Sequence, residues 1–335
     1  MRGRPARAVL ALATAGLVLA ACGESRPTTT TAAASAAAGA GDGTAEDGGP
    51  RAAPALPATV TDRSGAQVTV EDVSRIVVLN GDIAEIVFAL GLGANVVATD
   101  TSATFPPEVT QRPKIGYQRQ LSAEGILSHA PTVVIGDEGA GRAAAIEQLR
   151  GAGTPVVIVG EPKSLEAPAA KIRAVAAALG VAKAGDRLAS RVGREIAAAT
   201  ADLPPEGRRP RVAFLYVRGT QTLMIGGRGS GADAMIAGAG GIDAGSEAGI
   251  ERFAPLTPEA LVAAAPDVLL LLSAGGESVG GIDGVLGLPG VAQTPAGAGR
   301  RIIHFDDLYL IGLGPRTGSA LAELRAALHP DGAGS

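Results

Sequence analysis

Short apolar runs recur along the chain and are separated by longer stretches whose polar positions have helical spacing. Several runs are apolar at every position, as expected for strands of a parallel sheet that helices cover on both faces. The predicted strands are residues 76–79, 95–98, 133–135, 156–159, 212–217, 268–272 and 302–305. Residues 59–70 are expected to form a hairpin or an edge strand. This alternation predicts an α/β fold with parallel sheets.

The middle of the chain interrupts this alternation. Residues 164–179 and 182–203 are rich in alanine, carry charges at helical spacing and are separated only by Gly180 and its neighbour. No strand pattern occurs between Val159 and Arg211. Two sheet-forming regions and a long helical segment predict two lobes with a stiff connector. The expected divisions are an N-terminal lobe at 59–163, connecting helices at 164–203 and a C-terminal lobe at 204–335.

One segment of each predicted lobe has a counterpart in the other. Residues 121–135 align without gaps with residues 256–270. Each copy has a Ser or Thr suited to an N-cap, an acid in the first helical turn, a proline that ends the helix and an apolar strand. We interpret this similarity as a trace of duplicated lobes. Ordinary helix–strand patterning is the alternative explanation.

The first residues carry targeting information. Three arginines precede an apolar stretch at residues 8–21, which is shorter than the ~18 residues of a spanning helix and is typical of a secretory signal. The stretch ends Leu-Ala-Ala-Cys22, which resembles a bacterial lipobox. An ordinary signal peptide with an incidental cysteine is the alternative. We expect a signal peptide at 1–21, lipidation of Cys22, a flexible tether at 22–58 and a location on the extracytoplasmic face of the cell membrane.

Composition excludes several classes of function. The 335 residues include five Phe, three Tyr and no Trp, and the net charge is −4. A nucleic-acid-binding protein needs more aromatic residues or a basic surface, so no nucleic-acid partner is expected. The single cysteine excludes an internal disulfide and a thiolate cluster. His129, His304 and His329 lack the spacing of a zinc site.

Two segments resemble enzyme motifs. Residues 276–280 fit the G-x-S-x-G pattern around Ser278, but three residues separate them from the predicted strand 268–272. A hydrolase nucleophile turns directly off its strand, so a serine hydrolase using Ser278 is only an alternative of another class. Residues 227–232 fit a dinucleotide-binding pattern without the required second strand that ends in an acid. We expect a binding protein rather than an enzyme.

The lipobox, the two predicted lobes and the helical connector together resemble the substrate-binding lipoproteins of ABC importers. The resemblance is to the helix-linked class that serves siderophores, cobalamin and haem. Residues 116–125 and 306–316 are similar to the haem-binding members. The resemblance implies two Rossmann-like lobes joined by a long connecting helix, the class III periplasmic-binding-protein fold. It also implies a monomer that binds haem b and delivers it to an ABC permease for iron acquisition. A ferric siderophore or cobalamin is the alternative cargo.

The same resemblance assigns candidate ligand residues. In the resembled haem proteins a tyrosine of the first segment binds ferric haem iron, which implies this role for Tyr117, and Arg119 would stabilise its phenolate. Tyr216 and Arg218 repeat the Tyr-x-Arg pattern after the first strand of the second lobe, so they are expected to form a second ligand and its support. Two further arginines, Arg228 and Arg252, are candidate contacts for the haem propionates.

Two acids are candidates for contact with the permease. Glu85 and Asp233 are each predicted to follow a capping residue near the start of a helix, one in each lobe. The resemblance implies that such acids, exposed at the lobe tips, dock into arginine pockets of the permease. Helix capping and compensation of the helix dipole are the alternative roles.

Overall fold

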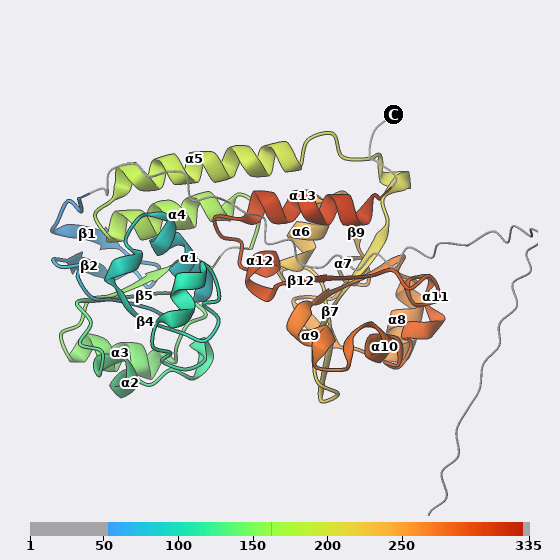
Figure 1. Cartoon of the computed structure of the whole chain (residues 1–335), viewed down its shortest axis with the longest axis horizontal. Helices are drawn as coiled ribbons and strands as arrows, with labels where there is room; N and C mark the ends of the chain where they lie inside the picture. The colour runs from blue at the N-terminus through green and yellow to red at the C-terminus, as the bar shows by residue number, and fades with distance from the viewer. Residues whose placement is uncertain (1–52, 162, 331–335) are drawn as a thin grey trace, which may run out of the picture. The chain divides into compact units, whose positions relative to one another are not determined.

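The computed structural model describes residues 53–161 and 163–330. Cys22, the signal peptide and most of the predicted tether lie outside these residues. The described chain forms two α/β lobes, with two long helices between them in the sequence (Figure 1). Within the described ranges, no helix combines the length and the hydropathy needed to cross a membrane.

The N-terminal lobe is built on a parallel sheet with the strand order β4-β3-β5-β6. Every residue of β3, β5 and β6 is buried, which confirms that these apolar runs lie between helices. The predicted hairpin is also present, because β1 and β2 pair antiparallel. The strands are β1 (Ala58–Thr61), β2 (Gln67–Val70), β3 (Ile76–Val78), β4 (Val96–Thr99), β5 (Val133–Asp137) and β6 (Val156–Val159).

Helices and short 3-10 turns connect these strands. The helices are α1 (Gly81–Ala89), α2 (Ala123–Leu127) and α3 (Ala143–Gly151), and the 3-10 turns are η1 (Gly93–Asn95), η2 (Pro107–Gln111) and η3 (Gln118–Gln120). The turn η3 and the irregular residues before it follow the carboxyl end of β4. The predicted Tyr117 segment therefore belongs to the edge of the sheet where the parallel strands end.

The connector consists of two helices, α4 (Ala167–Ala178) and α5 (Ala182–Ala199), that pack on each other. Gly180 joins them with a φ of +71°, a conformation that costs glycine little. Close packing requires Gly185, because a Cβ there would lie 2.3 Å from the Cβ of Ala176. The last helix, α13 (Thr317–Leu328), packs against α5. The stiff connector is therefore a helix pair that the end of the chain supports.

The C-terminal lobe differs from the prediction, because its sheet is mixed. β7, β9, β11 and β12 are parallel, but β8 and β10 extend the sheet in antiparallel fashion. The turn at Gly219, with a φ of +56°, lets β7 fold back directly into β8. The strands are β7 (Arg211–Arg218), β8 (Thr222–Gly226), β9 (Ile242–Asp243), β10 (Phe253–Pro255), β11 (Val268–Leu272) and β12 (Ile302–Phe305).

Short helices surround this sheet. They are α6 (Ala232–Gly238), α7 (Ala244–Glu247), α8 (Pro258–Ala264), α9 (Ser273–Glu277), α10 (Gly281–Leu286), α11 (Pro295–Ala298) and α12 (Asp307–Ile311), with 3-10 turns η4 (Glu206–Arg208) and η5 (Val291–Gln293). One hydrophobic cluster covers one face of both sheets and includes residues of α1, α4, α5 and α13. Each lobe has a second cluster of its own on the other face.

The segments that match in sequence have the same local structure. Ser122 caps α2 by accepting from the Gly125 N–H, and Thr257 caps α8 by accepting from the Ala260 N–H. After each helix an alanine takes a left-handed conformation, Ala130 with φ 44° and Ala265 with φ 43°. The strands also correspond, because β4-β3-β5-β6 matches β9-β7-β11-β12. These parallels favour duplication over chance patterning.

Candidate ligand-binding site

Tyr117 lies at the start of η3 and is 44% exposed. Among the described residues, its hydroxyl takes part in no hydrogen bond. The next residue, Gln118, fixes the segment: its side chain accepts from Asn80 and its carbonyl accepts from Gly141 N. Asn80 in turn accepts from Asp137 N at 2.9 Å. The ends of β3 and β5 therefore hold a loop that presents a free phenol to solvent.

Arg119 is exposed in the same turn. Within the described parts of the chain it forms no ion pair, and no cation–π contact joins it to Tyr117. Its supporting role for a phenolate therefore remains a prediction. A long, unpaired side chain on an exposed turn is free to reach a ligand.

Tyr216 lies on β7 and is half-buried. Its ring contacts Phe253 edge-on, with 5.7 Å between centroids, and the Arg218 guanidinium lies over the ring at 4.6 Å. Arg218 forms an ion pair with Asp307 and donates to the Val217 carbonyl at 2.9 Å. Burial raises the pKa of Asp307, although Arg218 opposes this effect. The predicted pair of Tyr216 and Arg218 is thus in contact. The Arg218 guanidinium lies over the ring of Tyr216 rather than at its hydroxyl, and it also forms the ion pair with Asp307.

Glu85 contradicts the prediction of an exposed acid. It is only 4% exposed, and Arg316 donates through Nε and Nη2 to its two carboxylate oxygens at 3.1 and 3.0 Å. Burial raises its pKa. Helix α1 begins at Gly81 after Asn80, so Glu85 is too far along the helix for a capping box. The prediction failed because the segment between α12 and α13 covers this end of α1.

The partner of Glu85 is itself enclosed by aromatic rings. The Arg316 guanidinium lies 3.7 Å from the ring centroid of Phe105 and 4.8 Å from that of Tyr309. The Tyr309 hydroxyl donates to Glu323 at 2.7 Å. Arg316 therefore joins α1 and the loop after β4 to α12. Nothing in the sequence pattern identified Arg316 as the partner of a buried acid.

Asp233 occupies the first turn of α6, as predicted. Its carboxylate accepts from Gly229 N at 2.9 Å and from Gly231 N at 3.0 Å. The N-cap is Gly231, which has no side chain able to cap the helix. Asp233 thus orders the glycine-rich turn before its own helix, and its docking role remains a prediction. Glu85 no longer offers a matching exposed acid in the other lobe.

The two candidate propionate contacts lie on the surface beside β8 and β10. The Arg228 Nε is 3.9 Å from a carboxylate oxygen of Glu251, and both side chains are mostly exposed. Arg252 is exposed as well and has a φ of +57°. Nothing in these contacts distinguishes a ligand contact from a solvated side chain, so both assignments stay predictions.

The alternative hydrolase site is not assembled. The Ser278 hydroxyl accepts from Gly219 N at 2.8 Å and donates to the Gly275 carbonyl at 2.7 Å. Within the described residues no hydrogen bond joins Ser278 to His304 or His329. His329 is the C-cap residue of α13. The same part of the chain contains no group of three or more His, Cys, Asp or Glu residues able to hold a metal ion.

A buried charge cluster that the sequence analysis missed lies beneath this edge of the N-terminal sheet. Lys171 of α4 is 3% exposed and pairs with Asp82 of α1 and, at 3.5 Å, with Asp137 of β5. Burial raises the pKa of Asp137, and the Lys171 charge opposes this effect. A lysine within an otherwise apolar helix face was the available signal, because such a lysine needs a buried partner.

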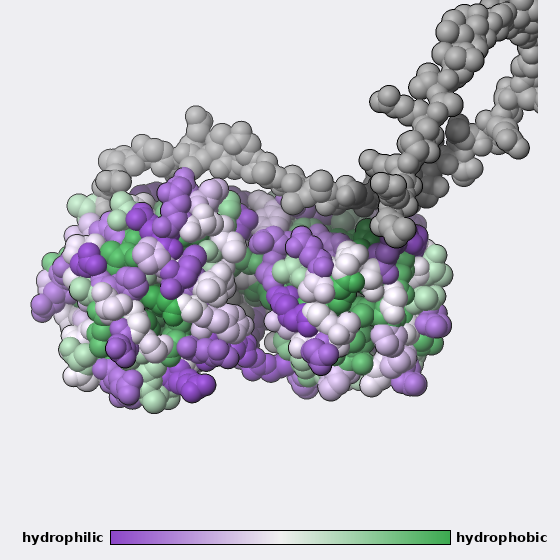
Figure 2. Space-filling model, turned by 60° about the horizontal axis from the view of Figure 1, so that its bottom comes forward, coloured by the Kyte–Doolittle hydropathy of each residue, from purple (hydrophilic) through white to green (hydrophobic). Residues whose placement is uncertain are grey.

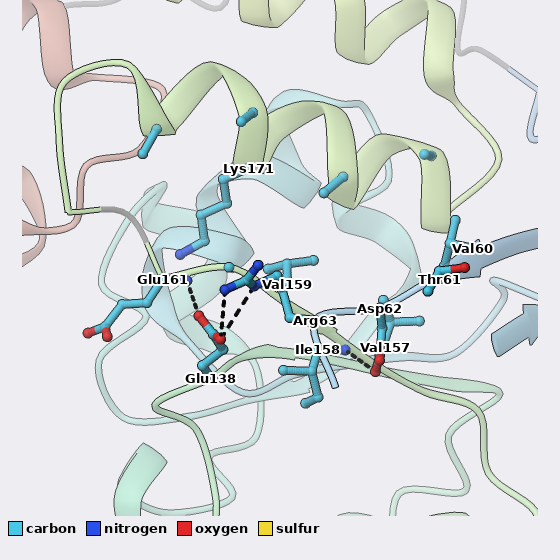
Figure 3. A pocket seen from close by; sticks show the side chains of 15 residues that line it. Val60, Thr61, Asp62, Arg63, Glu138, Val157, Ile158, Val159, Glu161 and Lys171 are labelled. Carbon is cyan, nitrogen blue, oxygen red and sulfur yellow. Dashed lines mark hydrogen bonds and ion pairs between the residues drawn. The ribbon is translucent and has the colours of Figure 1, made fainter. Parts of the chain in front are cut away.

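The structure also contains a cavity of about 550 Å³ at the edge of the N-terminal lobe (Figure 3). Alanines of α4, Val157 and Val159 of β6 and Val60 of β1 line it. At its mouth, Arg63 lies 3.3 Å from Glu138. None of the predicted ligand residues lines this cavity. The predicted site is instead expected where the surface is hollowed between the two lobes, on the side that Figure 2 brings forward.

Residues 76–309 match the family described as periplasmic binding protein. The match includes strands β3 to β12 and both connecting helices. The chain belongs to this family. The predicted class III fold with two lobes is therefore confirmed, with the antiparallel strands β8 and β10 as the correction already described. The members of this family are binding proteins.

Solved structures of haem-binding members are similar to this periplasmic binding protein. One is the haem-binding protein RhuT from Roseiflexus sp. RS-1 in apo form, with 56% identity over 77% of this chain and 99% of that chain and a TM-score of 0.75. Another is the haem-binding protein HmuT, with 37% identity over 83% of this chain and 91% of that chain and a TM-score of 0.78.

HmuT has also been solved as single alanine variants of a tyrosine, of the arginine two positions after it and of a histidine. The tyrosine and the arginine have the same spacing as Tyr216 and Arg218. The histidine precedes the tyrosine by the same number of residues by which Tyr117 precedes Tyr216. The three positions chosen for substitution in HmuT thus correspond in spacing to three of the predicted ligand residues.

A curated relative is the uncharacterized ABC transporter substrate-binding lipoprotein YvrC of Bacillus subtilis (strain 168). It is 34% identical over 136 residues, which are 40% of this chain and 43% of YvrC. The match therefore spans less than half of that relative.

Proposed function

We propose that this periplasmic binding protein captures ferric haem outside the cytoplasm and delivers it to the permease of an ABC importer for iron acquisition. The observation that carries the proposal is the exposed phenol of Tyr117, which has no hydrogen-bond partner among the described residues, on the loop at the carboxyl edge of its sheet. Its spacing to Tyr216 and Arg218 supports the proposal, as does the similarity to RhuT and HmuT.

Tyr117 would supply a ligand to the haem iron. A free phenol has a pKa of about 10 and binds metals poorly, but a ferric ion favours the phenolate. Because no group of residues 53–161 or 163–330 forms a hydrogen bond with the Tyr117 hydroxyl, ligation would break none of the hydrogen bonds described for this part of the chain. Arg119, exposed two residues later, would stabilise the phenolate or reach a propionate.

Tyr216 would be the second tyrosine of the site. Its ring is fixed by Phe253 and by the Arg218 guanidinium over one face. A cation near the ring favours the phenolate, so Arg218 would assist ligation by Tyr216 even though it does not contact the hydroxyl. The ion pair with Asp307 would hold Arg218 in this position.

The remaining assignments complete the proposal. Lipidation of Cys22 would hold the protein at the extracytoplasmic face of the membrane, and the cargo would be haem b bound by a monomer. Asp233 would contact the permease, with Arg228 and Arg252 available for the propionates. Glu85 is left out of this surface because it is buried against Arg316.

A hemin titration followed by the Soret band tests the cargo, and the three tyrosines of the chain provide a complete set of variants. We expect the parent to give a saturable Soret shift and a phenolate-to-iron charge-transfer band. Tyr117→Phe should lose the charge-transfer band and weaken hemin binding at least about tenfold, which corresponds to about 1.4 kcal/mol. Tyr309→Phe is the matched control, because its hydroxyl is bound to Glu323.

The variants separate the parts of the proposal. No Soret shift in the parent would contradict haem as the cargo. Loss of the charge-transfer band only in Tyr216→Phe would reverse the order of the two ligands. If Tyr117→Phe, Tyr216→Phe and the double variant all bind hemin like the parent, ligation by tyrosine is wrong.

A further inference from the structure

The outward face of α5 carries a row of basic residues. At 100° per residue, four basic positions fall within an arc of about 80°. All four are exposed, whereas Leu188, Val192 and Ile196 on the other face are buried. We call the row the α5 basic stripe; it consists of Lys183, Arg187, Arg191 and Arg194.

Most of this positive charge is not neutralised by the protein. Arg191 lies 3.3 Å from Glu195, and the nearby Asp186 pairs with Arg173 of α4. For the other three members of the stripe, the described residues contain no ion pair. The whole chain has a net charge of −4, so the charge of the stripe is opposite in sign to the net charge of the protein.

The stripe begins where the described chain enters the fold. The N–H of Ala55 donates to the carbonyl of Gly180 at 2.8 Å, and α5 begins at Ala182. The tether predicted between Cys22 and this point has about 30 residues. A flexible chain of that length has a root-mean-square span of about 30 Å. A lipid on Cys22 would therefore keep the membrane surface within reach of α5.

We propose that the α5 basic stripe makes a reversible contact with the anionic phospholipid headgroups of the membrane that holds the protein. Because the apolar face of α5 is buried against α4 and α13, the helix cannot insert, and the contact is purely electrostatic. Each basic residue near an anionic surface strengthens binding about fivefold, and salt weakens the attraction. This contact is a second attachment beside the lipid.

Such a contact would orient the anchored protein. In Figure 1, α5 runs along one side of the molecule, whereas α2 and the β7–β8 hairpin lie on the opposite side. With α5 against the membrane, the hollowed face of Figure 2 points away from it. This consequence rests on the proposed function: haem would be loaded from outside in this orientation, and the stripe would leave the lipid before the protein docks on a permease.

Vesicle pelleting tests the contact without the lipid anchor. The protein is the chain lacking residues 1–21 and carrying Cys22→Ser, mixed with vesicles of phosphatidylcholine alone or with phosphatidylglycerol. The stripe variant is Lys183→Gln, Arg187→Gln, Arg191→Gln and Arg194→Gln together. A control with the same composition of substitutions changes exposed residues elsewhere, namely Arg142→Gln, Lys163→Gln, Arg208→Gln and Arg300→Gln.

We expect the parent and the control to pellet with the anionic vesicles only, and high salt to release them. The stripe variant should partition at least about tenfold more weakly. The proposal is overturned if the parent does not pellet with the anionic vesicles or if the stripe variant pellets like the parent. It is also overturned if the control loses as much binding as the stripe variant. A hemin titration of the same proteins distinguishes failure of the membrane contact from failure of haem binding. The stripe variant should retain the Soret shift of the parent.

Discussion

The two lobes share a strand order, but the structure at the carboxyl edge of the sheet differs between them. In the N-terminal lobe the edge covers the buried charges of Asp82, Asp137 and Lys171, and an irregular loop carries Tyr117 above it. In the C-terminal lobe β7 continues into a hairpin with β8, and Tyr216 lies on the strand itself. The shared framework thus diverges at the edge where the candidate ligands are attached.

Because of this difference, Tyr117 and Tyr216 are held in different ways. Tyr117 is 44% exposed and forms no hydrogen bond through its hydroxyl among the described residues, whereas Tyr216 is held between Phe253 and Arg218. One lobe therefore offers a tyrosine that can turn toward a ligand, and the other offers one with a set orientation. Duplicated lobes do not imply equivalent ligands.

The largest expected effect is on stability, at the buried charge cluster that, within the described residues, occurs in the N-terminal lobe and has no counterpart in the C-terminal lobe. Lys171→Met leaves two buried carboxylates without their cation, and removal of one partner from a buried ion pair costs about 3–5 kcal/mol. Urea unfolding followed by far-ultraviolet circular dichroism should show this loss. Hydrogen exchange should place the faster opening in peptides of the N-terminal lobe.

A variant that also removes the acids is the control for this experiment. Lys171→Met combined with Asp82→Asn and Asp137→Asn leaves no charge within this cluster and should recover much of the lost stability. Equal stability of the parent and Lys171→Met would mean that the cluster is hydrated and contributes little to the contrast between the lobes.

The next effect is on the pH dependence of the unfolding free energy. It concerns two acids at matching positions of the lobes, Asp100 directly after β4 and Asp243 at the end of β9. Burial raises the pKa of Asp100 to about 6, although Ser102 donates to its carboxylate. The folded protein therefore holds this proton to higher pH than the unfolded chain, whose Asp has a pKa near 3.9. The contribution of Asp100 to stability is full below about pH 4 and is lost as the pH rises through about 6. It amounts to about 3 kcal/mol.

Asp100→Asn should flatten the dependence of unfolding free energy on pH between about 4 and 6. Asp243 accepts hydrogen bonds from the Ser246 N–H and hydroxyl, and burial raises its pKa as well. Asp243→Asn is the matching variant in the C-terminal lobe. A pH profile that Asp100→Asn leaves unchanged would contradict the raised pKa.

The smallest effect is where the lobes are most alike. Ser122→Ala and Thr257→Ala each remove the side-chain cap of a short helix, at a cost of about 1 kcal/mol. Thermal or urea unfolding should show similar losses for the two variants, and the double variant should show their sum because the sites are far apart in the fold. A large loss for only one of them would indicate that the two capped segments are not structurally equivalent.

Local patterns predicted most of the framework. The bounds of β6, β11 and β12 agree with the predicted runs, because buried strands of a parallel sheet are mostly apolar and the runs mark where they begin and end. The helix pair α4–α5 and its break at Gly180 also follow from local sequence. β8 and β10 were missed because they are short: the apolar run in β8 has only three residues, Leu223 to Ile225, and β10 has three residues and ends in Pro255.

The candidate site was predicted less completely, because it depends on contacts between distant residues. Tyr117 could be placed on its loop, and Tyr216 next to Arg218, from neighbouring positions alone. The burial of Glu85 could not, since its partner Arg316 is separated from it by 231 positions. Whether a charged residue near a helix start is a surface acid or half of a buried pair is decided by such distant segments.

The pair of Glu85 and Arg316 has a consequence for the order in which the protein is made. At about 5–20 residues per second, the ribosome adds Arg316 about 10 to 45 s after Glu85. During that interval the Glu85 carboxylate of α1 lacks its cationic partner. Once β6 has been made, the first lobe has all of its own strands but still lacks Arg316. A nascent chain that stops before residue 316 should therefore be a better substrate for proteases than the finished protein.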